Sequence, residues 1–475
     1  MQYEFPHFRI DRSDWLKGSN TYENYPDGGI IFSSSGYNVF KKPGWLANSP
    51  DLGNTVTSSL PTNIGISWGY GKGAIAQQVM VVGSNGSQDG SFYTVDTSGA
   101  FTKVGSDDTG RDYQLGKTST VFYHGSFYTT STTDICKNSS DLATRDTSWW
   151  VTTKGQTSLN SFAPHPQVVF GDIHYIADGQ YIHQDDNGTV QYNVFDLGQD
   201  WVITSMEVYN NKIYIAAEPY FNFSGTSEGF SRLFTWNGYS DSWIDEWFIG
   251  PRINALKVFK NVLYCWTPAY MGYWNGSAIK NLYPLNSSGS FPYTDGIVTT
   301  EDSMYFPDHL SLIRYGSPTP SGKNRFHRFQ TIPTRANSVG SYTRDGIEVC
   351  ATGVSNGSNH AFNSFGTPGG NKSYQFNRRL LSRPIRVRAY VIHTNGMASG
   401  QYAEFSYIDH AGTSSAVRRF GYAASALMQG KQVWRFDILG QPPTTLFDPV
   451  LTLAGDVYVR AIDVLYEPSN DKLNA

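Results

Sequence analysis

Five acidic residues in the middle of the chain are the candidates for acid/base chemistry: Asp172, Asp178, Asp245, Glu246 and Asp295. Glycoside hydrolysis by two carboxyl groups needs one that donates a proton and one that accepts a proton or attacks, so their pKa values must differ. Most of the five adjoin Gly or Asn, and in such turns an Asp side chain bonds its own backbone. We therefore expect turn residues here and predict no catalytic residue.

Metal and phosphate sites have little support from sequence motifs. The ten His residues include no His-Glu-x-x-His pattern, and His174 and His183 are expected on separate strands of one repeat. The stretch Gly69–Gly73 lacks the spacing and the strand-to-helix context of a phosphate-binding loop, so we expect it to be a turn. No metal ion and no cofactor are predicted.

One stretch of the chain is rich in arginine and is a candidate binding surface. It holds Arg378, Arg379, Arg383, Arg386 and Arg388. Guanidinium groups bind carboxylates and phosphates through two parallel hydrogen bonds, so these side chains could clamp an acidic sugar, a phosphate or the acidic face of a partner. Because Arg386 and Arg388 alternate with apolar residues, a solvated strand face is the alternative interpretation.

Aromatic residues at turns form a second candidate binding set. Trp236, Tyr273 and Trp274 lie beside turns that contain Asn-Gly. Exposed rings of this kind can stack on sugar rings, whereas packing between neighbouring sheets would bury them. Both interpretations stay open at the level of sequence.

The composition indicates an all-β protein. Charged residues make up 16% of the 475 residues and aromatic residues 15%, with 47 Gly and 22 Pro. A chain with few charges and many rings favours short strands joined by tight turns over long charged helices. The formal net charge of −4 provides no basic field at the surface, so nucleic-acid recognition is not expected.

A hairpin recurs along the chain and determines the expected fold. In each copy a short apolar strand is followed by a tight polar turn and a strand that contains Tyr. The aligned Tyr residues, each 39 to 50 residues after the previous one, are Tyr128, Tyr175, Tyr214, Tyr264 and Tyr305. A second hairpin follows the Tyr, so each unit holds about four strands. A weaker sixth unit lies upstream, around Val81.

Four-stranded units that repeat about every 40–50 residues are typical of β-propeller blades, because one small sheet must stack on neighbours to bury both of its faces. We predict a six-bladed propeller. Five or seven blades stay open, since the first unit is degenerate and residues 320–333 could complete a blade with N-terminal sequence. An array of sandwiches or a β-helix is the alternative fold.

Three regions are expected along the chain. Residues 1–54 form an extended arm that wraps or closes the ring, residues 55–333 form the propeller, and residues 334–475 form a β-sandwich of jelly-roll type. The last region is distinguished by alternating apolar stretches, such as Ile385–Ile392 and Val457–Val464, in place of the repeat.

The sequence shows no export or membrane signal. Its first residues have neither a basic nor an apolar segment, and no apolar run approaches the roughly 20 residues that a bilayer demands. The three cysteines, Cys136, Cys265 and Cys350, are far apart and outside any Cys-x-x-Cys spacing. This pattern fits synthesis in a reducing compartment and a packing role for the thiols.

The segment Ser35–Trp45, which leads into degenerate propeller repeats followed by a β domain, resembles bacteriophage tail proteins. The specific likeness is to the propeller-bearing tail hub, nozzle and accessory proteins of short-tailed phages, where a Lys/Arg-x-Pro-Gly step precedes the first blade. It covers roughly residues 1–330, and Lys42-Pro43-Gly44 is its one local match. No residue of that family is catalytic, so none is carried over.

The resemblance implies a non-enzymatic structural component of a virion tail, made in the host cytoplasm. It would assemble as a ring of copies and contact neck, fibre or host-surface partners, host glycans among them. Two other functions stay open. A glycan-binding propeller would have several equivalent shallow pockets, each with an aromatic side chain and an amide or Asp. A polysaccharide-degrading glycosidase would have one deep axial funnel lined with carboxylates.

Overall fold

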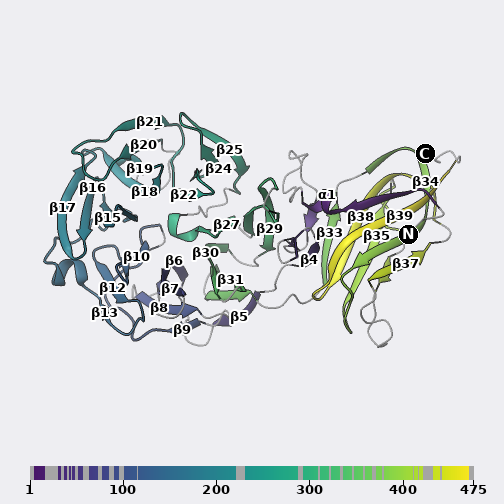
Figure 1. Cartoon of the computed structure of the whole chain (residues 1–475), viewed down its shortest axis with the longest axis horizontal. Helices are drawn as coiled ribbons and strands as arrows, with labels where there is room; N and C mark the ends of the chain where they lie inside the picture. Colours follow the sequence, from purple (N-terminus) through teal and green to yellow (C-terminus); the bar gives the residue numbers. More distant parts are fainter. Residues whose placement is uncertain are drawn as a thin grey trace. The chain divides into compact units, whose positions relative to one another are not determined.

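The protein consists almost entirely of β-strands in the computed structural model (Figure 1). Two compact units are formed: unit 1 by Met1–Asp51, Ile313–Thr331 and Gly366–Ala475, and unit 2 by Leu52–Leu312 and Ile332–Phe365. The structure describes residues 5–16, 30–33, 37–39, 42–43, 45–48, 52–56, 64–72, 77–84, 90–95, 101–114, 116–220, 230–286, 293–308, 311–319, 322–331, 335–344, 347–356, 359–365, 371–376, 379–409, 411–415, 417–420, 432–438 and 441–469. The expected all-β fold class is confirmed.

Seven four-stranded antiparallel sheets, which we call blades 1 to 7, occur within these described ranges. Blade 1 consists of β6 (Ile64–Lys72), β7 (Gln77–Ser84), β8 (Gly90–Val95) and β9 (Phe101–Lys103). Blade 2 consists of β10 (Thr120–Tyr123), β11 (Ser126–Thr130), β12 (Ile135–Ser139) and β13 (Arg145–Asp146). Blade 3 consists of β14 (Gln167–Phe170), β15 (Ile173–Asp178), β16 (Tyr181–Asp186) and β17 (Thr189–Asp196). Blade 4 consists of β18 (Trp201–Tyr209), β19 (Lys212–Pro219), β20 (Ser231–Trp236) and β21 (Asp245–Ile249).

The remaining blades follow the same strand order until the last. Blade 5 consists of β22 (Ala255–Phe259), β23 (Val262–Trp266), β24 (Tyr270–Trp274) and β25 (Ile279–Pro284). Blade 6 consists of β26 (Val298–Thr299), β27 (Ser303–Asp308), β28 (Ser311–Gly316) and β29 (Arg325–Thr331). Blade 7 consists of β30 (Arg335–Arg344), β31 (Ile347–Asn356), β32 (Asn359–Phe365) and β5 (Leu52–Val56). In blade 6, β28 and β29 fall largely within the residues grouped with unit 1.

The blades are arranged around a common centre (Figure 1). The first strand of each blade contacts the first strand of the next, in the order β6, β10, β14, β18, β22, β26 and β30, and β30 contacts β6. A closed ring of small sheets is a β-propeller. The part of the chain that the structure describes holds seven blades, the larger of the two alternatives to the predicted six, because β30–β32 form a blade that lacks the recurring Tyr hairpin.

Four of the recurring hairpins are closed by two-residue turns, between β10 and β11, β14 and β15, β18 and β19, and β22 and β23. Both central residues of each turn have positive φ, and these pairs are His124 and Gly125, Gly171 and Asp172, Asn210 and Asn211, and Lys260 and Asn261. Positive φ at both positions gives the turn whose twist matches that of the paired strands. The predicted hairpins are therefore confirmed.

One glycine is required by packing between blades. Gly69 lies within β6, and a Cβ at this position would be 2.5 Å from Thr120 Cγ2 and 3.0 Å from Phe127 Cδ1 of blade 2. The expectation of a turn from residue 69 onward is wrong, because β6 continues to Lys72. Glycine occurs there because the neighbouring blade approaches the strand backbone closely; Gly73 lies outside the described residues.

Unit 1 contains an eleven-stranded sheet in which two sets of strands enclose a core. One set is β2 (Ile30–Ser33), β33 (Asn371–Phe376), β35 (Tyr402–Ile408), β36 (Arg418–Phe420) and β38 (Thr444–Ala454). The other set is β1 (His7–Asp11), β3 (Tyr37–Asn38), β4 (Leu46–Asn48), β34 (Arg379–Thr394), β37 (Val433–Asp437) and β39 (Tyr458–Pro468). Pairing of β38 with both β33 and β34 joins the two sets.

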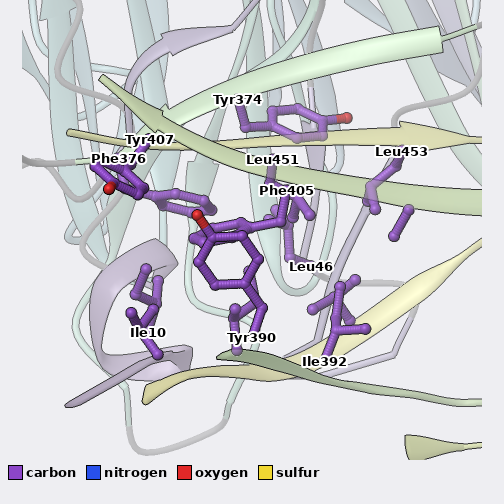
Figure 2. Close-up of a cluster of buried hydrophobic side chains, with 14 of the residues drawn as sticks. Ile10, Leu46, Tyr374, Phe376, Tyr390, Ile392, Phe405, Tyr407, Leu451 and Leu453 are labelled. Atoms are coloured by element: carbon purple, nitrogen blue, oxygen red, sulfur yellow. The ribbon is translucent and has the colours of Figure 1, made fainter. Parts of the chain in front are cut away.

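The core of unit 1 lies between these two sets of strands. Figure 2 shows Phe405 and Leu451 of one set beside Tyr390 and Ile392 of the other. The Tyr390 and Phe405 rings meet edge to face, with 4.7 Å between their centroids. Apolar residues at every second strand position produce this shared core, as a sandwich-like arrangement requires.

The N-terminal residues contribute strands to unit 1, since β1 and β4 pair with β39 and β2 pairs with β33. The structure thus differs from the expected arm: strands β1 to β4 belong to the same sheet as the C-terminal strands, and the next strand, β5, pairs with β32 in blade 7. Likewise β30–β32, expected in the sandwich after residue 334, belong to blade 7. Strands β5 and β32 are about 300 residues apart in the chain, so no local sequence pattern predicts their pairing.

Helical segments are few and short in the described residues. They are α1 (Arg12–Trp15), η1 (Trp149–Thr153) and η3 (Thr294–Gly296). The Asp11 side chain accepts from Ser13 N, and the Asp14 side chain accepts from Asp11 N, so α1 begins with a capping box. Among the described residues, no helix has the length and apolar character that crossing a bilayer requires.

Candidate functional site

A polar region lies where the first strands of the blades meet around the centre of the ring. The short helix η3 contacts β6, β22 and β30 there. Side chains from four blades and η3 interact at this position, and we call them the axial cluster: Ser67, Thr120, Glu207, Lys257 and Asp295. The cluster is the candidate site because its carboxyl groups lie inside the ring, where partial burial and neighbouring charges shift their pKa values.

Asp295 of η3 is held by groups from two blades. Its Oδ2 accepts hydrogen bonds from Thr120 N (2.9 Å) and Ser67 Oγ (3.2 Å). Burial raises the pKa of the Asp295 carboxyl to about 6, although Lys257 and the two hydrogen bonds act in the opposite direction. This carboxyl therefore exchanges its proton only slightly below neutral pH.

Glu207 on β18 and Lys257 on β22 belong to adjacent blades. Burial raises the pKa of Glu207 to about 7; the Lys257 ammonium lowers it and the Asp295 carboxylate raises it. Both side chains keep part of their surface accessible. The axial cluster therefore holds two carboxyl groups that bind and release protons near neutral pH beside one cation.

The high pKa of Glu207 makes stability depend on pH. Unfolding returns this pKa from about 7 to the ordinary value of 4.5, so between these values the folded chain keeps a proton that the unfolded chain releases. The stabilising contribution of protonated Glu207 is fully present below pH 4.5 and is lost as the pH rises through 7. At about pH 8 we expect the free energy of unfolding of Glu207→Gln to exceed that of wild type by about 1–2 kcal/mol. The gain is limited to this range because water reaches the side chain and screens its charge.

Urea-induced unfolding of wild type and Glu207→Gln at about pH 5 and about pH 8 measures this effect. The stabilisation by Glu207→Gln should be much smaller at the lower pH. Glu301→Gln, in the exposed turn between β26 and β27, is the matched control and should follow wild type at both pH values. An equal difference between wild type and Glu207→Gln at the two pH values would contradict the assignment.

A small pocket, which we call the axial pocket, lies beside Asp295 and has a volume of about 20 Å³, enough for about one water molecule. It is formed by Thr204 within β18 of blade 4 and by segments just before the first strands of blades 2, 3, 5 and 6. The lining residues are Gly116, Lys117, Thr118, Ser119, Pro164, Pro166, Thr204, Asn254, Tyr293, Thr294 and Asp295. Two of them carry a buried polar atom with no hydrogen-bond partner in the described part of the chain, namely Thr118 Oγ1 and Asn254 Nδ2.

The structure does not bring the five predicted carboxylates together. Asp172 occupies the exposed turn between β14 and β15. Asp245 and Glu246 lie on β21, the outermost strand of blade 4, where they pair with Lys212 (2.9 Å) and Arg232. The prediction of turn residues thus holds for Asp172 and is wrong for the two residues of β21. Of the five, Asp295 alone reaches the centre of the ring.

The fifth predicted carboxylate, Asp178, lies inside blade 3 with buried histidines. His165 Nδ1 and His183 Nε2 are each 3.5 Å from its carboxylate, and His174 Nδ1 is 3.9 Å from the Asp185 carboxylate. Burial lowers the pKa of His165 and His174, so both are neutral at pH 7. Within the described residues, no group of three or more His, Cys, Asp or Glu is placed to hold a metal ion.

Two cysteines are buried in the propeller. Cys136 and Cys265 are free thiols, and burial raises the pKa of both. A thiol of raised pKa is a poor nucleophile at neutral pH, which is consistent with a packing role. The side chain of Cys350 lies outside the described residues.

Two members of the arginine stretch make internal contacts in unit 1. Arg379 Nη2 donates to Asp14 Oδ1 (3.1 Å) and to the carbonyl oxygen of Arg9 (3.0 Å), which ties α1 to β34. Arg388 Nε donates to Glu467 Oε2 (2.8 Å) on the neighbouring strand β39. These two guanidinium groups therefore already bind carboxylates of the same chain.

The rest of the arginine stretch is less engaged. Arg383 is exposed and Arg386 is half-buried, whereas Arg378 lies outside the described residues. Arg379 and Arg388 therefore form ion pairs within the chain, and Arg383 lies at the surface. The role of the stretch as a partner interface stays a prediction.

Neither predicted tryptophan presents its ring to solvent. Trp236 on β20 is 0% exposed and contacts Tyr175 and Phe195 of blade 3, with centroid distances of 5.3 and 4.7 Å. Trp274 on β24 is 5% exposed and contacts Trp247 of blade 4 at 5.1 Å. Stacking of these two rings on a sugar is therefore excluded, because packing between blades buries them.

Glu207 and Lys257 were missed by sequence reasoning. Strand register places one residue of the first strand opposite each recurring Tyr, and these residues are Val121, Val168, Glu207, Lys257 and Val298. A charged residue thus stands in blades 4 and 5 at a repeat position that holds Val in three others. Charge at an otherwise apolar repeat position is the signal that could have identified the site.

No protein-family profile matches the chain, and no curated protein matches it. Among solved structures, an exo-β-1,3-galactanase from Phanerochaete chrysosporium aligns with a TM-score of 0.29 and 11% identity, covering 86% of this chain and 100% of the galactanase. The N-terminal domain of Nup159 aligns with a TM-score of 0.36 and 9% identity, covering 70% of this chain and 95% of that domain. With such low TM-scores, the propeller assignment rests on strand pairing, and the two likenesses carry no argument about function.

Proposed function

We propose that the protein is a non-enzymatic structural component of a phage virion tail, which assembles with copies of itself and with other tail proteins. The resemblance of residues 1–330 to propeller-bearing tail proteins supports this proposal. A surface on blade 4 supports it independently and is the observation that carries it.

The local part of the resemblance is a turn. Trp45 N donates to the carbonyl oxygen of Lys42 (2.9 Å), and the Lys42 ammonium lies 3.6 Å from the centroid of the Trp45 ring. The turn leads directly into β4. The described residues of this step thus precede a strand of the unit 1 sheet, whereas in the phage proteins the step precedes the first blade.

The surface on blade 4, which we call the aromatic rim, follows β21 at the outer edge of the ring (Figure 1). Its exposed members are Tyr239 (84% exposed), Trp243 (38%), Ile244 (46%) and Phe248 (65%). Other exposed large apolar side chains in the described residues are more scattered. Monomeric proteins rarely expose such apolar groups together, and a cluster of them marks an interaction surface.

Ring contacts connect the aromatic rim to the rest of blade 4. Phe248 contacts Phe230 at 5.3 Å, and Phe230 contacts Trp201 at 6.5 Å. At the other end of β21, Trp243 contacts the buried Phe234 at 5.3 Å. Side chains already held by such contacts lose less conformational entropy when a partner covers them, which favours binding.

The position of the aromatic rim on an edge strand also favours assembly. Proteins that stay monomeric protect an outer strand with charge or proline, because its free backbone groups can pair with another chain. The ion pair between Arg232 of β20 and Glu246 of β21 lies beside Phe248, so polar groups border the rings. An apolar centre with a polar border is the usual composition of a protein interface.

Self-association tests the proposal. We expect the wild-type protein to form closed oligomers in sedimentation and electron microscopy. The double variant Ile244→Glu/Phe248→Glu should weaken association by at least about tenfold, because it places two charges in the apolar centre of the interface.

Gln191→Glu is the matched control, since Gln191 is exposed on β17, the outermost strand of blade 3. It adds one charge outside the aromatic rim and should assemble as wild type does. Two results would overturn the proposal. One is a wild-type protein that stays monomeric at a concentration of about 100 μM, which is about 100 times the dissociation constant of a micromolar interface. The other is a double variant that assembles as wild type does.

A further inference from the structure

A second pocket, which we call the basic pocket, lies in unit 1 and has a volume of about 250 Å³. It is formed by α1 and by the segment that joins β28 to β29, and all of the described residues that line it belong to unit 1. Basic and hydroxyl side chains dominate its wall, namely Arg12, Lys323, Arg325, Ser13, Ser317 and Thr319. None of these residues belongs to the axial cluster or to the aromatic rim.

The three cations of the basic pocket have no counter-charge in the described part of the chain. None of Arg12, Lys323 and Arg325 forms an ion pair with another described residue, and no Asp or Glu is among the described residues that line the pocket. The positive charge reaches the neighbouring strand positions, since burial and the charges of Arg314 and Arg325 lower the pKa of His327 to about 3. Like charges that share one pocket repel one another, so an anion bound between them is attracted by all three.

The two carboxylates closest to Arg12 in the sequence are used in other contacts. Asp11 Oδ1 accepts a hydrogen bond from Ser13 N (2.9 Å), and Asp14 Oδ2 accepts one from Asp11 N (3.0 Å). Asp14 Oδ1 also accepts from Arg379 Nη2 (3.1 Å). Both carboxylates therefore serve the start of α1 and its link to β34, and the Arg12 guanidinium is left for a ligand.

Hydroxyl groups stand beside the cations. A Cβ at Gly322 would be 2.1 Å from Ser317 Oγ and 2.5 Å from Thr319 Oγ1, so glycine at this position lets two hydroxyls approach each other. Ser317 Oγ donates to the carbonyl oxygen of Thr319 (2.7 Å). The hydroxyls of Thr319 and Ser13 have no hydrogen-bond partner among the described residues. Two hydroxyl donors are thus available to a ligand.

The exposure of the lining residues shows how a ligand would enter. Arg12, Ser13 and Lys323 are exposed, whereas Arg325 is half-buried and Ser317 is 5% exposed. The exposed residues form the mouth of the basic pocket, and the less exposed ones form its inner end. Water screens the charge of Arg325 less than the charges at the mouth, so an anion that reaches it is held more strongly.

The charges and donors of the basic pocket suit a phosphate group better than a carboxylate. A phosphate monoester carries a charge of roughly −1.5 to −2 at about pH 7 and has three strong acceptor oxygens. It would offset most of the charge of the three cations, whereas a single carboxylate would leave two of them uncompensated. Guanidinium groups bind phosphate through two parallel hydrogen bonds, and a lysine adds a point charge.

We propose that the basic pocket binds a phosphate group, with Arg12, Lys323 and Arg325 as its cationic contacts and Thr319 Oγ1 as a hydroxyl donor. The volume of about 250 Å³ exceeds the roughly 150 Å³ of a cavity that holds benzene. A small organic group attached to the phosphate therefore also fits, and Leu16 and Pro318 supply apolar surface for it. The ligand is thus free phosphate or a small phosphate monoester.

Binding is tested by calorimetry on the full-length protein at about pH 7.5, with inorganic phosphate, glucose 6-phosphate, glucuronate and glucose as probes. Sodium chloride keeps the ionic strength constant, so that screening is not mistaken for binding. At least one phosphate probe should bind with a dissociation constant below about 1 mM and raise the melting temperature, and glucuronate and glucose should bind more weakly.

The two phosphate probes distinguish the sources of the ligand. Tighter binding of glucose 6-phosphate identifies a phosphate monoester, and equal or tighter binding of inorganic phosphate identifies free phosphate. Dissociation constants above about 1 mM for both phosphate probes overturn the proposal. Binding of glucuronate or glucose as tight as that of the better phosphate probe also overturns it.

Variants connect the binding to the basic pocket. Arg12→Gln/Lys323→Gln should weaken phosphate binding at least about tenfold and leave the melting temperature unchanged or raised, because it removes two cations that lack counter-charges. Thr319→Val should weaken binding about threefold or more by removing a hydroxyl donor. The matched control is Arg383→Gln/Arg460→Gln, which removes two exposed cations from β34 and β39 of unit 1 and should bind phosphate as wild type does.

Unchanged phosphate binding in Arg12→Gln/Lys323→Gln overturns the proposal, as does an equal loss of binding in the control. The inference goes beyond the proposed function and does not depend on it. Ile244→Glu/Phe248→Glu should bind phosphate as wild type does, and Arg12→Gln/Lys323→Gln should assemble as wild type does. Failure of the phosphate tests therefore leaves the assembly proposal untouched, and failure of assembly leaves the basic pocket untouched.

Discussion

Trp236→Ala is expected to lower the free energy of unfolding of the propeller by about 3–5 kcal/mol. The ring is fully buried between blades 3 and 4, in contact with Tyr175 and Phe195, and its Nε1 donates to the carbonyl oxygen of Ser240 (2.7 Å). Truncation removes the apolar contacts, leaves a cavity and deprives the Ser240 carbonyl of its donor. Urea-induced unfolding followed by circular dichroism measures the loss.

Trp243→Ala is the matched control for this prediction. It removes the same type of side chain from the same blade, but Trp243 is 38% exposed, so the loss should stay below about 1 kcal/mol. Trp236→Phe should retain most of the stability because the ring contacts persist. If Trp236→Ala and Trp243→Ala unfold at the same urea concentration, the packing between blades 3 and 4 is described wrongly.

The repeating hairpins could be predicted because their determinants are local. A two-residue turn between alternating strands fixes the register of its own hairpin, and turns such as Asn210-Asn211 tolerate the positive φ that the hairpin needs. The recurrence of Tyr opposite the first strand then implied a blade. The propeller class followed from that pattern, since a four-stranded unit must stack to bury both faces.

The number of blades depends on a pairing between distant strands, which no local sequence pattern predicts. Blade 7 is completed by β5, which pairs with β32 across about 300 residues. Its other strands lack the recurring Tyr, so they resembled the alternating strands of the C-terminal region. The N-terminal arm was assigned to the ring for the same reason, although its strands complete the sheet of unit 1.

The candidate site was hidden for a different reason. Residue type alone makes Asp295 a candidate, whereas Glu207 and Lys257 lie in alternating strands where charged residues normally face solvent. Closure of the ring turns that strand face inward, so burial raises the pKa of Glu207 to about 7. The unpaired atoms of Thr118 and Asn254 depend on five blades meeting, and no single segment contains that information.

Asp463→Ala is expected to lower the free energy of unfolding of unit 1 by about 2–4 kcal/mol and to release its N-terminal strand. Asp463 on β39 is fully buried; its carboxylate accepts hydrogen bonds from Arg9 Nε (2.6 Å) and Arg9 Nη2 (2.9 Å) and lies 2.8 Å from His393 Nε2. Arg9 lies directly opposite on β1. Removing the carboxylate leaves the Arg9 guanidinium without this buried counter-charge, and partial exposure of Arg9 keeps the loss below that of a fully buried pair.

Unfolding in urea and limited trypsin digestion measure the two effects of Asp463→Ala, and cleavage after Arg12 should accelerate because α1 follows β1 directly. Asp437→Ala removes the Asp partner of Arg435 on β37, where the Asp side chain is 67% exposed, so its cost should be below about 0.5 kcal/mol. Asp463→Asn separates charge from shape: the amide keeps one acceptor for Arg9, so its loss should lie between those of the two alanine variants. Equal stability of Asp463→Ala and Asp437→Ala would mean that the Arg9–Asp463 pair does not hold β1 on the sheet.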